Sequence, residues 1–175
     1  NGINNFKYKN DLVINAKNSG TLGRLILGLL IKSPKKIKII GDKSLSKRDF
    51  SRVTVPLEKF GAKFYYKKRN TLPLTILGSQ SLKGINYIEN KGSAQCKSSV
   101  MLAALNSSGT TFIKAKKSRN HSELLFKYLK IPIKIKKTKK YDFISIKKPK
   151  KIHAFNYQIP GDISSSAFFM VLTML

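Results

Sequence analysis

The sequence predicts an α/β fold in which a βαβαββ unit recurs and one helix of each unit lies in the interior. The first observation is a repeated order of polar turns, helices and strands, with landmarks roughly 70 residues apart, longer than common helical solenoid repeats. The second is that the first helix of each unit is apolar on nearly every face, which is typical of a buried helix. The third is that the following helix carries only an apolar stripe, as at 52–60, so it is expected to face outward, with sheets between it and the interior helix. Helices alternating with strands favour this fold over a helical bundle or a β-sandwich.

The first unit is expected between residues 18 and 89. A polar stretch at 18–21 precedes an apolar helix over 22–31. A second helix, over 49–60, ends at Gly61, a residue type favoured just after a helix. The strands of this unit are predicted at 36–40, 72–77 and 85–89.

The same order recurs in the second half of the chain. Residues 92–95 open a helix that runs to residue 105, and the polar turn 118–121 leads into a helix over 122–130. The strands are predicted at 110–115, 141–146 and 152–159. A third copy begins with the polar run 161–166 and continues into apolar residues. Because Ser, Thr, Asn or Asp can cap each first helix, the helix starts are expected to converge on a polar surface where anions bind.

The chain is strongly basic. It holds 35 Lys and Arg against 8 Asp and Glu, a formal net charge of +27, which first suggests a nucleic-acid binder. Only five of the basic residues are arginine, and the lysines scatter in pairs over strand ends and turns. Specific readers of phosphates and bases rely on the planar fork of arginine, so a solvated basic surface is favoured. A basic nucleic-acid-binding module, supported by the tyrosine-lysine run at 65–69, is the alternative from a different class.

The few cysteines and histidines limit the disulfides and metal sites that the chain can form. A single cysteine, Cys96, allows no internal disulfide and suits a reducing compartment, so a cytoplasmic location is expected. His121 and His153 are isolated and the carboxylates show no ligand spacing, so neither a metal site nor a cofactor is expected. No apolar run approaches the ~20 residues that span a bilayer. The chain has no initiator methionine and ends inside an apolar run, and we expect it to be a piece of a longer protein.

The candidate functional segments are four polar turns, at 18–21, 47–48, 93–95 and 118–121. They combine helix starts, an amide and two arginines, all of which are donors suited to phosphate or carboxylate. Arg24, Arg48 and Arg119 lie in or beside these turns although lysine is six times commoner, which indicates a need for the guanidinium fork. Spacing alone fits a second interpretation equally well, in which Arg24 is a helix-surface residue and the hydroxyl residues are only helix caps.

Five segments of the sequence resemble one family, in the family's own order. The segment NSGTLGRL at 18–25 is similar to the enolpyruvate-binding segment of the 5-enolpyruvylshikimate-3-phosphate synthase family. The segment SAQCKS at 93–98 is similar to a helix start of one bacterial class of these enzymes. The other matching segments are 41–62, 118–123 and 160–169. Because five ordered segments span nearly the whole chain, the resemblance is specific.

The resemblance implies an inside-out α/β barrel, since the family has two similar domains of three βαβαββ units with the helices inside. Residues 1–160 would form most of the N-terminal domain, and 161–175 would cross over into the start of the C-terminal domain. The family transfers the enolpyruvyl group of phosphoenolpyruvate to the 5-hydroxyl of shikimate 3-phosphate and releases phosphate. The implied partners are these two small molecules, with no nucleic acid, membrane, metal or cofactor. The full-length protein is expected to be a monomer.

The resemblance also assigns substrate-binding roles residue by residue. The phosphoenolpyruvate pocket would contain Asn18, Gly20, Thr21 and the clamp arginine Arg48. The shikimate 3-phosphate site would contain Ser93 and Ala94, with Ser118 and Arg119 on the phosphate. Gln95 would lie between the two substrates. The family's acid and base residues match no segment here, so no catalytic residue is expected in this chain, which alone is expected to be inactive.

One position departs from the family pattern, and one related enzyme competes for the assignment. Asp49 follows Arg48 where the family usually has proline, and a carboxylate there is expected to pair with the guanidinium and weaken phosphate binding. The competing enzyme is UDP-N-acetylglucosamine enolpyruvyl transferase, but the Ser-Ala-Gln and Lys-Arg turns fit the shikimate enzyme better. Cys96 falls in the first turn of an apolar helix, unlike the loop cysteine of that competitor, so a core role is expected.

Overall fold

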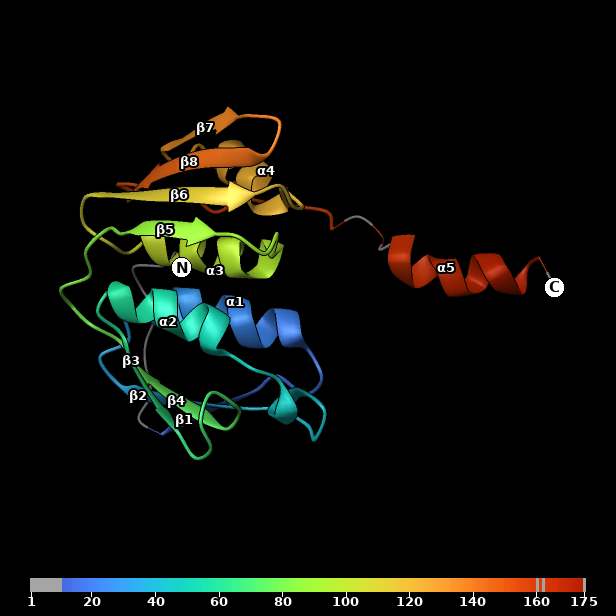
Figure 1. Cartoon of the computed structure of the whole chain (residues 1–175), viewed down its shortest axis with the longest axis horizontal. Helices are drawn as coiled ribbons and strands as arrows, with labels where there is room; N and C mark the ends of the chain where they lie inside the picture. Colours follow the sequence, from blue (N-terminus) through green and yellow to red (C-terminus); the bar gives the residue numbers. More distant parts are fainter. Residues whose placement is uncertain (1–10, 160, 162, 175) are drawn as a thin grey trace.

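The computed structural model describes residues 11–159, 161 and 163–174. Two four-stranded sheets form the outer layers of the main body, with α1 (Gly20–Leu30), α2 (Ser51–Lys59) and α3 (Ala94–Ala104) between them (Figure 1). The helices therefore lie inside and the sheets outside, as the family resemblance implied. The expectation that the second helix of the unit faces outward is wrong for α2, because its Val53 and Leu57 are fully buried between the sheets (Figure 1).

The first sheet belongs to the first half of the chain. Its strands are β1 (Leu12–Asn15), β2 (Lys36–Ile40), β3 (Lys63–Tyr66) and β4 (Leu74–Leu77), in the order β1-β2-β4-β3. β1 and β2 are parallel, because α1 crosses over between them, and the other pairs are antiparallel. Ile37 and Ile76 are register partners at the centre of this sheet and are fully buried against the helices.

The second sheet repeats the topology of the first. Its strands are β5 (Asn86–Glu89), β6 (Thr110–Lys116), β7 (Ile133–Lys137) and β8 (Tyr141–Lys147), in the order β5-β6-β8-β7. The pair β5 and β6 is parallel across α3, and the other two pairs are antiparallel. α4 (His121–Tyr128) follows β6 as α2 follows β2. The repeat predicted from the sequence is therefore confirmed as two units of identical strand order.

The strand predictions were wrong in several places. The strand predicted at 85–89 exists as β5, but it opens the second unit because it pairs with β6. β1, β3 and β7 were not predicted, since short strands such as KFYY and IKIKK mix lysines with apolar residues and expose one face. The strand predicted at 152–159 is absent, and residues 151–159 have no regular structure. Phe155 and Tyr157 instead place their rings edge-on to Tyr128, at centroid distances of 6.1 and 5.9 Å.

A close helix crossing holds the two units together. A Cβ on Gly28 of α1 would lie 2.2 Å from the backbone oxygen of Ser99 in α3, so only glycine fits this contact. Ser99 also donates its hydroxyl to the backbone oxygen of Arg24 at 3.0 Å. Leu27 and Val100, on the two helices, are fully buried. The two apolar helices are therefore interior, as predicted.

The third apolar helix behaves differently. α5 (Ile163–Leu172) projects away from the two-sheet body in Figure 1. Its side chains are largely exposed, Phe168 at 82% and Phe169 at 72%. The prediction that all three apolar helices are buried is therefore wrong for the described residues, because no described element packs over α5. The domain boundary predicted at 160–161 remains a prediction.

Candidate functional site

The starts of α1 and α3 lie together because the two helices pack against each other. Ser19 accepts a hydrogen bond from the backbone N–H of Leu22 at 3.1 Å, and Ser93 accepts one from Cys96 at 3.3 Å. Each serine therefore caps its helix, as the sequence predicted. The remaining N–H groups at the two starts carry partial positive charge, which favours a bound anion.

Gln95 joins the two helix starts through its side-chain amide. Its Oε1 accepts a hydrogen bond from Arg24 Nη1 at 2.7 Å, and its Nε2 donates to Thr21 Oγ1 at 2.9 Å. Both hydrogen bonds cross from α3 to α1, so they fix the amide orientation and place Gln95 at the centre of the predicted site. The guanidinium of Arg24 also lies over the ring of Phe50, with Cζ 5.5 Å from the ring centroid.

Two guanidinium groups lie beside the first residue of α1. A Cβ on Gly20 would come within 3.1 Å of Arg48 Nη1 and 3.3 Å of Arg24 Nη1. The absence of a side chain at this position therefore leaves room for both arginines at the helix start. Arg48 itself is exposed and follows a short 3-10 turn (Leu45–Lys47), in which Leu45 is fully buried. That buried leucine anchors the turn that presents Arg48.

A carboxylate connects the loop before α1 to the loop before this 3-10 turn. Asp42 accepts a hydrogen bond from the backbone N–H of Leu45 at 2.7 Å and another from the side-chain amide of Asn18. The Leu45 hydrogen bond is the main cause that lowers the pKa of Asp42 below its ordinary value, with the Asn18 amide and the nearby Arg48 charge adding to it. Asn18 is thereby held at the rim of the α1 start.

Asp49 does not take the position that the sequence suggested. Its carboxylate accepts hydrogen bonds from the backbone N–H of Ser51 at 2.8 Å and from the Ser51 hydroxyl at 2.7 Å. The hydroxyl is the largest cause that lowers the pKa of Asp49. Among the described residues, no ion pair joins Asp49 to Arg48. Because its oxygens face Ser51 at the start of α2, the guanidinium of Arg48 stays available.

A small cavity of about 160 Å³ opens beside Gln95. It is lined by Thr21, Leu25, Ala94, Gln95, Ser98, Arg119, His121 and Ser122. Four of these are predicted substrate-binding residues, drawn from three of the four polar turns. Ser118, a fifth, has a buried hydroxyl without a hydrogen-bond partner among the described residues. Gly20 and Arg48 therefore lie together at the α1 start, and Arg119 lines the cavity with Gln95.

Two residues that build this site were not among the predicted substrate-binding residues. Arg24 was noted as an arginine beside the first polar turn, with a helix-surface role as the alternative, and it links Gln95 to the start of α1. Its position four residues after Gly20, on the same face of the helix, was the available signal. Lys97 was quoted only as part of a motif, yet it is fully buried and contacts the turn that carries Arg119. No periodicity marks Lys97, because its neighbours on α3 are buried on every side.

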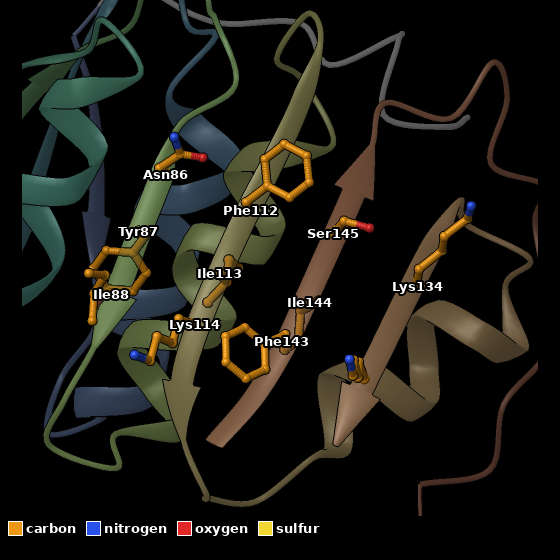
Figure 2. Close-up of a pocket in the computed structure, with 11 residues that line it drawn as sticks. Asn86, Tyr87, Ile88, Phe112, Ile113, Lys114, Lys134, Phe143, Ile144 and Ser145 are labelled. Atoms are coloured by element: carbon orange, nitrogen blue, oxygen red, sulfur yellow. The ribbon is translucent and has the colours of Figure 1, made fainter. Parts of the chain in front are cut away.

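A separate cavity of about 370 Å³ lies on the outer face of the second sheet. Figure 2 shows Phe112 of β6 and Phe143 of β8 on this face together with Lys114. Ile113 and Ile144 alternate with them along the strands and are buried on the opposite face. None of the predicted substrate-binding residues lines this cavity, and it contains no helix start and no arginine. It belongs to the solvent side of the sheet.

In the parts of the chain that the structure describes, no three His, Cys, Asp or Glu side chains are grouped so as to hold a metal ion. Over the same residues, no helix combines the length and apolar character needed to cross a bilayer.

Comparison with known proteins gives one consistent family. The family model for EPSP synthase (3-phosphoshikimate 1-carboxyvinyltransferase) matches residues 1–175. The 3-phosphoshikimate 1-carboxyvinyltransferase of Thermotoga sp. (strain RQ2) is 42% identical over 156 residues, 89% of this chain and 36% of the relative. That of Bacillus subtilis (strain 168) is 40% identical over 171 residues, 97% of this chain and 39% of the relative.

A solved structure agrees with these relatives. EPSP synthase from Acinetobacter baumannii superposes with a TM-score of 0.83 and 35% sequence identity, covering 97% of this chain and 38% of that chain. The chain thus spans a little more than a third of the proteins it matches, 36% and 39% of the two curated relatives. Since the family model covers the chain from end to end, the chain belongs to the EPSP synthase family.

Proposed function

We propose that the protein carrying this chain transfers the enolpyruvyl group of phosphoenolpyruvate to the 5-hydroxyl of shikimate 3-phosphate, and that this chain forms one wall of the substrate cleft. The observation that carries the proposal is the Gln95 amide, held between two capped helix starts by Arg24 and Thr21. It has a pair of arginines on one side and the Arg119 cavity on the other. Two separate anion sites that meet at one amide suit a reaction between two small polyanions.

Phosphoenolpyruvate is assigned to the α1 side of Gln95. Its phosphate and carboxylate would take hydrogen bonds from Arg48 and from the N–H groups at the α1 start, with Asn18 at the rim. Gly20 supports this assignment because its missing side chain lets both guanidinium groups lie beside the helix start. Arg48 supports it because its guanidinium carries no ion pair among the described residues.

Shikimate 3-phosphate is assigned to the cavity on the α3 side. Its phosphate would bind the Arg119 guanidinium at the cavity and the neighbouring Ser118, whose buried hydroxyl has no hydrogen-bond partner among the described residues. Its ring would rest against Ser93 and Ala94 at the start of α3. This placement brings the 5-hydroxyl toward Gln95 and toward the enolpyruvyl carbon on the other side.

The proposed chemistry balances in two steps. The 5-hydroxyl oxygen bonds to C2 of phosphoenolpyruvate while C3 takes up a proton and the hydroxyl loses one, which gives a tetrahedral intermediate. The bond from C2 to the phosphate oxygen then breaks and C3 returns a proton, so that enolpyruvylshikimate 3-phosphate and phosphate are released. This chain contributes binding and orientation, and the acid and base groups are assigned to the rest of the protein. Family membership supports this reading over both the nucleic-acid module and the UDP-N-acetylglucosamine enzyme.

The partners and location follow from the same proposal. The two small polyanions are the proposed ligands, and the protein is proposed to act as a cytoplasmic monomer without nucleic acid. The isolated chain is expected to bind shikimate 3-phosphate only weakly and to turn nothing over, since it supplies one wall of the cleft. Calorimetry on the 175-residue chain tests this, and tight binding would contradict a cleft shared with the rest of the protein.

Phosphate release by the full-length protein tests the function. Wild-type protein is expected to release phosphate only when both substrates are present. Gln95→Ala is expected to lower kcat/KM by about tenfold to a hundredfold, because hydrogen bonds at the meeting point of the substrates, worth about 1 kcal/mol or more each, are removed. Gln80→Ala is the matched control, because Gln80 is exposed and its amide donates a hydrogen bond to the backbone oxygen of Lys32, away from the helix starts.

The outcomes separate the function from the site. Wild-type protein that releases no phosphate contradicts the function. Turnover that survives in Gln95→Ala at the wild-type rate contradicts the site while leaving the function in place. Equal losses in Gln95→Ala and Gln80→Ala would point to general damage and would also count against the site.

A further inference from the structure

Lys97 is an unusual residue to find at the start of an interior helix. It lies four residues after the cap Ser93 in α3, and its side chain is 1% exposed. Burial of an ammonium group is unfavourable, and the positive end of the helix dipole opposes a cation at this position. Its partners must therefore compensate for both effects.

Two partners hold the ammonium group. Lys97 Nζ lies 2.5 Å from Glu123 Oε1 and donates a hydrogen bond to the backbone oxygen of Arg119 at 3.0 Å. Glu123 is itself 4% exposed in its side chain and lies in the first turn of α4. Its second oxygen has no hydrogen-bond partner among the described residues, so Lys97 is the group that neutralises this carboxylate. The pair joins α3, α4 and the turn before α4.

The turn that Lys97 contacts has few other polar attachments. The Ser118 hydroxyl lacks a partner among the described residues, and the Asn120 side chain makes no capping hydrogen bond to α4. The Arg119 side chain is exposed at the cavity beside Gln95. Among the described residues, the Lys97 hydrogen bond to the Arg119 backbone oxygen is therefore a direct polar link between the interior helix and the residue that presents the guanidinium.

The first unit supports its arginine turn with apolar groups instead of an ion pair. Gly23 lies four residues after Ser19 and so matches Lys97 in α3. A Cβ on Gly23 would touch the ring of Phe50 at 3.4 Å, and Phe50 is fully buried two residues after Arg48. In both units, the residue at this place in the interior helix packs on the turn that carries an arginine.

We infer that Lys97 and Glu123 form a positioning pair that fixes the 118–120 turn, so that Arg119 meets the phosphate of the substrate on the α3 side. This inference rests on the proposed function and adds two residues that touch no substrate. Removing the pair should weaken binding of shikimate 3-phosphate and leave the phosphoenolpyruvate side unchanged, because Arg48 depends on Phe50 instead.

The double variant Lys97→Met/Glu123→Leu in the full-length protein tests the pair. Replacing a buried ion pair with apolar residues of similar size often keeps or raises stability, so the melting temperature should stay close to that of the wild type. The Met side chain cannot donate to the Arg119 oxygen. The KM for shikimate 3-phosphate should therefore rise about tenfold, the loss expected for one charge-assisted hydrogen bond, and the KM for phosphoenolpyruvate should change less than about twofold.

Val100→Ala is the matched control, since Val100 is a fully buried apolar residue on α3, three residues after Lys97, and carries no charge or hydrogen-bonding group in its side chain. It should lower the melting temperature without changing either KM. If the double variant does not fold, Glu123→Gln carries the same test, and its KM for shikimate 3-phosphate should rise by a smaller factor. A folded variant with the wild-type KM for shikimate 3-phosphate overturns the inference.

A second measurement tests the positioning role independently of the proposed function. Amide hydrogen exchange at 118–120 should be faster in the double variant than in the wild type, without substrate and independently of turnover. Unchanged exchange there overturns the positioning role even if the enzyme is active. Absence of turnover in the wild type, with faster exchange in the variant, would reject the proposed function and leave the positioning of the turn intact.

Discussion

The two units have the same strand order, yet they secure their arginine turns by different chemistry. In the first unit the ring of Phe50 packs on Gly23 beneath the Arg48 turn. In the second unit the ion pair of Lys97 and Glu123 lies beneath the Arg119 turn. Topology therefore decides where each turn lies, and the side chains beneath it decide how firmly and by what forces it is held.

The loops at the two helix starts show a second difference. The first unit joins its loops through side chains, with Asp42 accepting from both Asn18 and Leu45. The second unit brings its loops together through the backbone, where Gly92 has a φ of +70° and a Cβ would lie 3.4 Å from the Lys117 oxygen. A carboxylate thus controls one rim of the site, while a glycine in the left-handed region shapes the other.

The second helices differ in how they are covered. α2 packs against α3 of the following unit, so that Val53 and Leu57 are fully buried. α4 has no such neighbour among the described elements, and Leu124 and Tyr128 are more than half exposed in a groove of about 770 Å³. The first helix of the next copy of the repeat is α5, but it projects away from the two-sheet body and does not cover α4 as α3 covers α2 (Figure 1).

The largest expected effect comes from removing the apolar support of the first unit. Phe50→Ala should lower the free energy of unfolding of the chain by about 3–5 kcal/mol, the usual loss for a buried phenylalanine, because a cavity opens beneath the Arg48 turn. In the full-length protein it should also raise the KM for phosphoenolpyruvate more than that for shikimate 3-phosphate. Urea unfolding and steady-state kinetics measure the two effects.

Phe60→Ala is the control for this change, because Phe60 is 1% exposed at the far end of α2. It should cost similar stability and leave both KM values alone. If Phe50→Ala and Phe60→Ala act equally on phosphoenolpyruvate, the ring of Phe50 has no special role beneath Arg48, and the contrast between the units disappears.

The next largest effect concerns the contact between the units. Gly28→Ala should lower the free energy of unfolding by about 2–3 kcal/mol, since a methyl group at that position would overlap the Ser99 carbonyl and force α1 away from α3. The matching position in α3 is Leu102, so one unit supplies the small residue and the other the large one. Urea unfolding measures the loss.

Gly161→Ala is the control for the helix crossing, because a Cβ at Gly161 meets no atom within 4 Å. Its unfolding free energy should stay within about 0.5 kcal/mol of the wild type. A Gly28→Ala chain as stable as this control would mean that α1 and α3 can move apart without a loss in the free energy of unfolding. The units would then be less tightly coupled than their packing indicates.

The fold could be predicted from the sequence where the pattern was strong. The helices α1 and α3 begin at serine caps and are apolar on nearly every face beyond their first turns, so both their positions and their burial followed from residue types alone. The strands β3 and β7 were missed because they are short sheet edges in which lysine alternates with partly buried apolar residues. The strand predicted at 152–159 failed because its apolar residues pack on Tyr128 instead of joining a sheet.

The site was less accessible to sequence reasoning than the fold. The convergence of the polar turns could be predicted, since helix starts in a repeated unit lie at the same end. The hydrogen bond between Arg24 and Gln95 could not be predicted, because it depends on how closely α1 approaches α3. The burial of Lys97 could not be predicted either. The chain has 30 lysines, and nothing in the sequence indicates that Lys97 pairs with Glu123, 26 residues away.

The smallest expected effect is on the carboxylate link of the first unit. The pKa of Asp42 is lowered in the folded chain, so its hydrogen bonds should favour folding above the ordinary aspartate pKa of about 4 and lose that effect as pH falls through the lower folded value. Asp42→Asn should therefore unfold at a lower urea concentration than the wild type at neutral pH. The two midpoints should converge as the pH drops below about 4.

Glu58→Gln is the control for the pH dependence, since Glu58 is an exposed carboxylate on α2 away from this loop. Its urea midpoint should follow that of the wild type over the whole pH range. A constant difference between Asp42→Asn and the wild type from neutral to acidic pH would show that the charge of Asp42 is not what joins the two loops. The first unit would then hold its loops as the second does, by backbone shape, and the difference between the two rims would be one of residue type only.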